Sequence, residues 1–340
     1  MSNSTAESAR SRRGIKLRKV LKRLLIVLLV YSLSSMLFSA VMFRLLYARR
    51  DGIPAYSRTY AELGGEAPPR ETFTFRSGGN LLTGYRYPAE DPRGLILVIN
   101  GIGAGADAHL GEIRRFLAEG WSVVTWDATG VGSSEGRGLI GLQQIRMDLL
   151  AYLDTDAAKN ETLPVVLYGH SAGAYAAATA LDSGYPIRAA VCVCGFDAPV
   201  SVMLHHARAR VGPLADLQYP FLLLENVFLF GSDADDSAGE SIGRSRTPVL
   251  LVESSSDDYV PHELALSESG AAAGNPNVYR LLVDAEWRNE HNTPWLSDDA
   301  AAYVGTLGPD EPVDKDRAGA LDEAYMDRIL AFFAAAVPDA

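Results

Sequence analysis

Short apolar runs rich in β-branched residues alternate with longer helix-like segments along most of the chain. The runs predict buried strands, and the segments between them have the apolar spacing or the alanine content of helices. The predicted strands cover residues 95–99, 123–126, 165–168, 189–193, 247–253 and 278–283, and the predicted helices cover residues 113–118, 142–156, 172–181 and 321–336. This alternation indicates an α/β fold with a mostly parallel sheet and helices on both of its faces.

Two further strand-like runs precede this region. Residues 72–75 and 81–87 flank the Gly-Gly-Asn sequence at 78–80. Glycine and asparagine adopt the backbone conformations that tight turns require. The sequence therefore predicts a β-hairpin at the start of a domain that covers residues 71–340.

The longest apolar stretch lies near the N-terminus. Residues 24–43 are 20 consecutive residues without a charge, and a helix of that length crosses about 30 Å of hydrocarbon. Eight basic residues precede the stretch and three follow it closely, and the more positive flank stays in the cytoplasm. We expect a basic cytoplasmic tail (1–23), a single transmembrane helix (24–43) in the plasma membrane, a linker (44–70) and an extracytoplasmic domain.

A cleaved signal peptide is the alternative interpretation of the same stretch. The apolar core of a signal peptide is shorter, roughly 7–15 residues. Cleavage also needs small residues in an A-x-A-like pattern, whereas Ala40 has Phe38 two positions before it. The sequence therefore favours an uncleaved signal anchor.

Charge is distributed unevenly along the chain, whose formal net charge is −11. Residues 1–50 carry 11 of the 31 basic residues and a single acid, so residues 51–340 are strongly acidic. A domain of this charge repels a phosphate backbone. We therefore expect no nucleic-acid partner; the oligomeric state is left open.

The cysteine content predicts neither a disulfide framework nor a metal centre. Cys192 and Cys194 alternate along one predicted strand, where a disulfide has poor geometry. We expect both to be small buried apolar side chains. The sequence has no Cys/His cluster with zinc-ligand spacing and no Walker-type phosphate loop, so we expect no metal and no cofactor.

A sharp strand-to-helix turn carries the candidate nucleophile. The sequence Gly169-His170-Ser171-Ala172-Gly173 follows a predicted strand and precedes an alanine-rich helix. This is the pattern of a nucleophile elbow, in which glycines allow the serine hydroxyl to stand clear of the backbone. The N-terminus of the following helix would direct partial positive charge at Ser171.

Candidates for the general base and its carboxylate follow in chain order. Acyl transfer by a serine needs both groups. Asp257 and Asp258 come after the predicted strand 247–253, and His291 comes after the strand 278–283. The carboxyl ends of parallel strands meet at one edge of a sheet, so these side chains would lie beside Ser171.

The other histidines fit the role of base less well. His170 is expected to pack under the turn, and His109 to lie at the surface or to cap a helix. His205 and His206 fall in an insertion, and His262 follows the acids too closely to be oriented by them.

The order of these motifs resembles that of the α/β-hydrolase superfamily, and in particular membrane-anchored bacterial serine hydrolases of the lysophospholipase-like or serine aminopeptidase-like kind. Five landmarks carry the resemblance, between the hairpin near residue 72 and the last helix near 336: Asn100-Gly101-Ile102-Gly103, the segment 127–136, the elbow at Ser171, Asp257 with Val260-Pro261, and His291-Asn292. Two positions depart from the family pattern. Asn100 stands where a histidine is usual, and Ser254 where a glycine is common.

The resemblance implies a Ser171-Asp257-His291 triad. Asp257 is preferred because the acid of the family stands three residues before the valine, and Asp258 is the alternative acid. The resemblance also implies an oxyanion hole formed by the backbone N–H groups of Ala172 and Ile102, or of Gly103 in place of Ile102. Asn100 leaves that backbone intact but changes a side chain expected to line the site.

Two insertions flank the predicted site. Residues 196–246 include an apolar, aromatic stretch and are expected to form a small helical cap, or alternatively a helix pair on the core. Gly195 and Gly243 near its ends are candidates for hinges or turns. Residues 293–320 are acidic and form either part of the pocket rim or a solvated loop.

Three functions are consistent with these residues. The first is a membrane-anchored serine hydrolase that acts on carboxylic esters, lysophospholipids or thioesters through an acyl-enzyme. The second is a serine peptidase of the aminopeptidase or prolyl-oligopeptidase-like kind, which uses the same residues. The third is a non-catalytic binding protein on the same scaffold.

Overall fold

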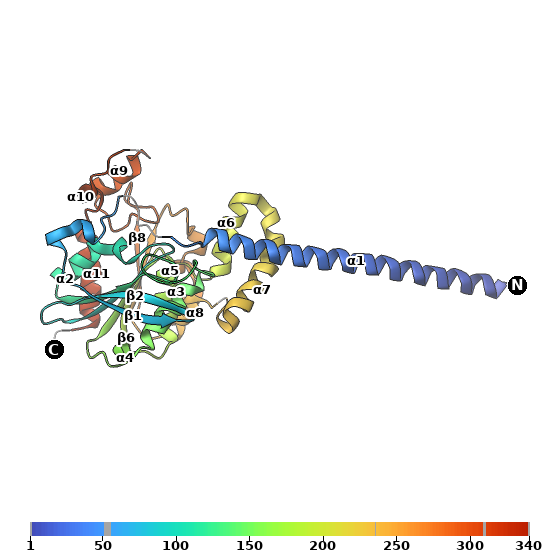
Figure 1. Cartoon of the computed structure of the whole chain (residues 1–340), viewed down its shortest axis with the longest axis horizontal. Helices are drawn as coiled ribbons and strands as arrows, with labels where there is room; N and C mark the ends of the chain where they lie inside the picture. The colour runs from blue at the N-terminus through green and yellow to red at the C-terminus, as the bar shows by residue number, and fades with distance from the viewer. Residues whose placement is uncertain (1, 51–55, 235, 309–310, 339–340) are drawn as a thin grey trace.

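The structure is a computed structural model that describes residues 2–50, 56–234, 236–308 and 311–338. Within these residues an 8-stranded sheet has the strand order β1-β2-β4-β3-β5-β6-β7-β8 (Figure 1). The strands are β1 (Glu71–Ser77), β2 (Asn80–Tyr87), β3 (Gly94–Ile99), β4 (Trp121–Trp126), β5 (Val165–His170), β6 (Ile187–Val193), β7 (Val249–Ser254) and β8 (Val278–Val283).

The sheet is mostly parallel, as the sequence predicts. β1 and β2 form the expected antiparallel hairpin, with Ser77 opposite Asn80. β2 also runs antiparallel to β4, and the pairs from β4 through β8 are parallel. The carboxyl ends of β5, β7 and β8 therefore lie at one edge of the sheet.

Helices cover both faces of the sheet. On one face α3 (Gln143–Leu153), α5 (Ala172–Thr179) and α8 (Ala238–Arg244) bury apolar side chains against the strands. On the other face α2 (Leu110–Ala118) and α11 (Glu323–Ala336) do the same. These two layers confirm the expected α/β fold.

The N-terminal segment is one long helix, α1 (Ser2–Leu46), whose N-terminal part projects away from the domain (Figure 1). Residues Lys16–Leu46 are long and apolar enough to cross a membrane. The helix is thus longer than the expected span of 24–43, because helical structure extends through the basic tail and into the expected linker.

The segment that follows α1 lies against the domain. Ala48 forms an isolated β-bridge with Gly138, and Arg50 forms one with Val131. The Arg49 guanidinium donates to the Ser134 carbonyl at 2.8 Å. Residues 47–50, expected to belong to a linker, are therefore a strap that joins α1 to the domain; residues 51–55 lie outside the described part.

The insertion at 196–246 contains two different parts. Beside α1 lie α6 (Pro199–Val211), the 3₁₀ segment η4 (Gly212–Gln218) and α7 (Tyr219–Phe230), and we call these three elements the cap (Figure 1). α8 instead packs on the core, where Ala238 and Ile242 are fully buried. The cap is therefore narrower than expected.

The candidate hinge glycines are points of close packing. A Cβ on Gly243 would lie 2.2 Å from the Ala271 carbonyl oxygen, and a Cβ on Gly195 would lie 2.8 Å from the Ala174 Cβ. Glycine is required at these positions because neighbouring groups approach so closely.

Candidate active site

Ser171 occupies a strained turn between β5 and α5. Its backbone has φ 57° and ψ −120°, a conformation that non-glycine residues rarely adopt. A Cβ on Gly169 would lie 2.3 Å from the Gly173 oxygen, and a Cβ on Gly173 would lie 2.0 Å from the Ile99 oxygen. Both glycines are therefore needed for the turn, which exposes the Ser171 hydroxyl at the N-terminus of α5.

Asp257 and His291 form a buried pair. The His291 Nδ1 lies 2.7 Å from the Asp257 Oδ2, and both side chains are less than a tenth exposed. The other carboxylate oxygen accepts hydrogen bonds from the backbone N–H groups of Tyr259 and Val260, each at 2.8 Å. These bonds fix the carboxylate, so that Nδ1 of His291 acts as the donor and Nε2 is left available.

Asp258, the alternative acid, is exposed to solvent. No hydrogen bond or ion pair joins it to His291 within the described residues. The turn after β7 directs adjacent side chains differently, and only Asp257 points back to the histidine.

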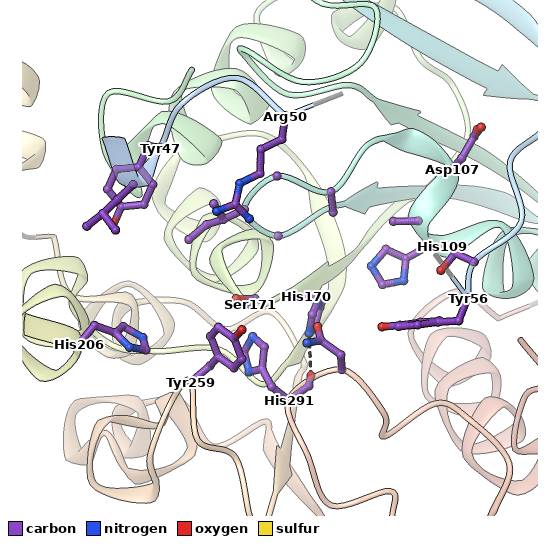
Figure 2. Close-up of a pocket in the computed structure, with 18 of the residues that line it drawn as sticks. Tyr47, Arg50, Tyr56, Asp107, His109, His170, Ser171, His206, Tyr259 and His291 are labelled. Carbon is purple, nitrogen blue, oxygen red and sulfur yellow. Dashed lines mark hydrogen bonds between the residues drawn. The ribbon is translucent and has the colours of Figure 1, made fainter. Parts of the chain in front are cut away.

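Ser171 and His291 line one cavity (Figure 2). The His291 ring stacks on Tyr259, with 5.1 Å between ring centroids and 28° between planes. In the described part of the chain no hydrogen bond joins the Ser171 hydroxyl to His291. Catalytic hydrogen bonds are often long before substrate binds.

His170 has a positioning role that the sequence analysis did not identify. Its Nε2 donates to the His291 carbonyl at 2.9 Å, which ties the histidine loop to the elbow (Figure 2). Burial lowers the pKa of His170 well below its usual value, so the ring stays neutral. The residue pattern contains no signal for this contact, because 121 residues separate the partners.

The expectation that His109 lies at the surface is wrong, whereas it does stand at the N-cap position of α2, without a capping hydrogen bond from its side chain. The side chain is only 2% exposed, and its Nδ1 lies 2.6 Å from Glu112 Oε1. Its ring packs against His170 and Trp295. The start of α2 therefore packs against His170, the residue before Ser171.

Three backbone N–H groups lie beside Ser171 in the chain or in the cavity-lining loop after β3. Ala172 begins α5, and Ile102 and Gly103 lie in the loop after β3 and line the cavity. Within the described residues none of these three N–H groups donates a hydrogen bond. The loop is adjacent to the nucleophile, since a Cβ on Gly101 would lie 3.1 Å from the Ser171 Cβ.

Asn100 does not line the site, contrary to expectation. Its side chain is buried, and its Nδ2 donates to Thr125 Oγ1 at 3.2 Å and to the Trp126 carbonyl at 3.3 Å. The residue instead ties the end of β3 to β4, which holds the loop at 101–103 in place.

Both cysteines are free and buried, as expected. Burial raises the pKa of Cys192 to about 12 and raises the pKa of Cys194 as well. Cys194, Asp257 and His291 offer ligand atoms within 4.8 Å of one another. Asp257 and His291 already bond to each other and the thiol stays neutral, so the group fits proton transfer better than a metal.

The cavity has a volume of about 720 Å³. One end is formed by α1 and the cap, whose lining side chains are mostly apolar but include His206, Arg210 and Gln218. The other end is lined by charged residues from segments 56–58, 107–114 and 315–316. Ser171 and His291 lie between these ends. The Arg50 guanidinium also lines the cavity (Figure 2), and no ion pair to it is present in the described segments.

Comparison with known proteins finds one matching family model and several similar structures. Residues 90–227 match the family model described as serine aminopeptidase, S33. The Pyrococcus furiosus esterase Pf2001 is similar in structure, with a TM-score of 0.56 and 16% identity over 84% of this chain and 97% of that one. A Vibrio vulnificus alpha-beta hydrolase has a TM-score of 0.52 and 18% identity over 87% and 93% of the two chains.

TT1662 from Thermus thermophilus is also similar, with a TM-score of 0.52 and 17% identity over 80% of this chain and all (100%) of that one. No curated protein is detectably similar in sequence. At these identities the likeness to solved structures establishes a shared fold.

Proposed function

We propose that this chain, an α/β-hydrolase of the serine hydrolase class, is a membrane-anchored carboxylic ester hydrolase. One observation carries the proposal. His291 is oriented by a 2.7 Å hydrogen bond to Asp257 and lines the same cavity as Ser171, whose backbone is strained at the start of α5. Strained nucleophiles beside an oriented histidine are typical of acyl transfer.

The proposed reaction has two steps. Ser171 Oγ attacks the carbonyl carbon while His291 Nε2 takes its proton, and the tetrahedral intermediate collapses as the histidine returns that proton to the leaving alcohol. Water, deprotonated by His291, then attacks the acyl-enzyme, and the histidine returns this proton to Ser171 Oγ as the ester bond to the serine breaks and the carboxylic acid is released. Asp257 stays ionised and stabilises the imidazolium formed in each step.

The oxyanion of each intermediate is assigned to the N–H groups of Ala172 and of Ile102 or Gly103. Ala172 follows Ser171 at the start of α5, Ile102 and Gly103 line the cavity, and none of their N–H groups donates a hydrogen bond within the described residues. Each such donor contributes about 3–4 kcal/mol to transition-state stabilisation in serine hydrolases.

The anchoring part of the proposal rests on α1. Residues Lys16–Leu46 can span a membrane by length and composition, and eight basic residues lie before residue 24. This asymmetry supports a cytoplasmic N-terminus and a catalytic domain on the other side of the membrane.

A serine peptidase is the second candidate function, and the description of the matching family model favours it. An aminopeptidase needs a free carboxylate for the substrate amine. Asp107 accepts from Arg70 at 3.2 Å, Glu112 pairs with His109, and Asp316 pairs with Arg58. The acids that line the cavity already have partners, so the ester is the better substrate.

Labelling of the full-length protein with a fluorophosphonate tests the proposal. We expect one adduct on Ser171, and loss of acyl-ester hydrolysis by about 10⁴-fold or more in Ser171→Ala and His291→Ala. Cleavage of aminoacyl-naphthylamides but not of p-nitrophenyl esters would support the peptidase. Absence of any adduct on the folded protein would favour a non-catalytic binding protein.

A further inference from the structure

The anchor helix forms part of the wall of the catalytic cavity. Phe38, Met42 and Phe43 of α1 line the same cavity as Ser171. The C-terminal part of α1 is held there by the cap, since the Tyr31 ring makes an edge contact with Phe221 at 5.4 Å and the Tyr31 hydroxyl donates to the Leu217 carbonyl at 3.1 Å.

The facing wall comes from the cap, where apolar side chains lie beside His206, Arg210 and Gln218. Met203 and Ala207 of α6 and Leu222 of α7 line it. Apolar walls favour the binding of an acyl chain because they remove its hydrocarbon from water. The lining residues of α1 carry no charge, whereas segments 56–58, 107–114 and 315–316 supply several charged side chains, so an extended acyl group fits better along α1.

We propose that α1 and the cap form an acyl-chain subsite that opens into the lipid bilayer, so that the substrates are amphiphilic acyl esters drawn from the membrane. This inference rests on the proposed function. It adds that a membrane-spanning helix contributes directly to substrate selection.

The opening is located by Phe38. This side chain lines the cavity and is also 53% exposed, so the cavity reaches the surface beside it. Phe38 precedes the end of the uncharged stretch 24–43 by five residues, or about 8 Å along a helix. An acyl chain that leaves the cavity at this point enters hydrocarbon rather than water.

Chain-length selectivity tests the subsite. Met42→Trp fills the cavity from α1, and Leu37→Trp places the same ring on the same helix at a residue that is 67% exposed and does not line the cavity. In proteoliposomes we expect Met42→Trp to lower the ratio of dodecanoate to butyrate ester hydrolysis about tenfold. Leu37→Trp should leave that ratio as in the wild type.

Equal ratios in Met42→Trp and the wild type would overturn the subsite while hydrolysis itself still supports the proposed function. If the wild-type protein showed neither ester hydrolysis nor fluorophosphonate labelling, the proposed function itself would be overturned. The two failures are therefore distinguishable.

A second measurement does not depend on a folded variant. A dodecyl fluorophosphonate with a terminal diazirine is attached to Ser171 of the wild-type protein and then photolysed. We expect cross-links to α1 within residues 38–46 or to α6 and α7. Cross-links confined to segments 56–58, 107–114 or 315–321 would overturn the proposal.

The outer surface of the cap independently indicates contact with lipid. Large apolar side chains that do not line the cavity are exposed there: Leu214 (70%), Leu217 (57%), Leu224 (50%), Val227 (46%) and Phe228 (86%). α7 packs against α1 at Tyr31, which lies within the uncharged stretch 24–43. We infer that the cap is immersed in the outer leaflet beside α1.

Depth-dependent quenching tests this immersion. Phe228→Cys in the full-length protein is labelled with an environment-sensitive fluorophore and placed in vesicles that contain brominated lipids. The native cysteines, Cys192 and Cys194, are buried and are not expected to react with the label. Tyr279→Cys is the control, because Tyr279 is 55% exposed but packs against Phe332 of α11. Strong quenching only at position 228 is expected; equal quenching at both positions, or none, would overturn the inference.

Discussion

At the scale of single residues, the site depends on the strained backbone of Ser171 and on two glycines whose positions have no room for a side chain. A non-glycine residue held in a sparsely populated conformation costs about 1–3 kcal/mol, and Ser171 is in such a conformation. The strain persists because Gly169 and Gly173 let β5, α5 and the end of β3 approach one another. The packing of the sheet therefore maintains the exposed hydroxyl.

The choice between the two adjacent acids gives a direct test at this scale. Asp257→Asn should lower kcat by about 10⁴-fold, because the amide no longer holds His291 in the tautomer that accepts a proton from Ser171. Asp258→Asn should retain wild-type kcat, because Asp258 is exposed. Steady-state hydrolysis of a short p-nitrophenyl ester measures both; comparable losses in the two variants would contradict the assignment of Asp257.

The candidate site residues could be identified in the sequence because each lies in a local turn that follows a strand. The spacing of Asp257 and Val260 reflects a carboxylate that caps its own loop. The contacts of His109 and His170 could not be predicted, because they depend on how α2 and the loop at His291 meet in space. The roles of the triad and of the oxyanion donors stay predictions.

At the scale of elements, the strands and the hairpin are confirmed because apolar alternation and turn residues determine them locally. The position of α1 was not predicted. Its contact with the cap joins residues 186 positions apart. Hydropathy predicts a membrane-spanning helix but contains no information on which part of the domain that helix contacts. The apolar character of α7 was visible in the sequence, but its location beside the anchor was not.

Glu225 on α7 gives a pH-dependent prediction for the cap. Burial raises the pKa of its carboxyl group to about 7, and its Oε2 has no hydrogen-bond partner among the described residues. A carboxyl pKa raised by folding stabilises the folded state below the unfolded pKa, and this contribution is lost as the pH rises toward the folded pKa. Stability should therefore fall between about pH 4.5 and 7.

Glu225→Gln should remove that part of the pH dependence and stabilise the protein above pH 7 by on the order of 1 kcal/mol, allowing for solvent screening. Thermal unfolding in nanodiscs at pH 5 and pH 8 measures the change. Glu90→Gln is the control, because Glu90 is exposed and should leave the pH dependence as it is. A wild-type slope retained in Glu225→Gln would contradict the role of this carboxyl.

At the scale of the whole molecule, the strap at 47–50 connects α1 to the domain. The strap at 47–50 lies against the loop at 130–138 through two β-bridges, and Arg49 adds hydrogen bonds to carbonyls of Ser134 and Gly136. Movement of the strap would move Phe43 and Met42, which line the cavity. On the proposed function and the proposed acyl-chain subsite, we therefore expect membrane attachment and substrate selection to be coupled through these backbone contacts.

Gly138 is the position at which this coupling can be broken. It has φ 143°, and a Cβ there would lie 2.0 Å from the Tyr47 carbonyl oxygen, so Gly138→Ala must displace the strap. We expect the free energy of unfolding to fall by about 1–3 kcal/mol, together with a lower dodecanoate-to-butyrate ratio. Gly120→Ala is the control, because Gly120 has φ 76° but nothing within 4 Å of its Cβ position. If Gly138→Ala lost stability but kept the wild-type ratio, the strap would hold the fold without positioning α1 for the substrate.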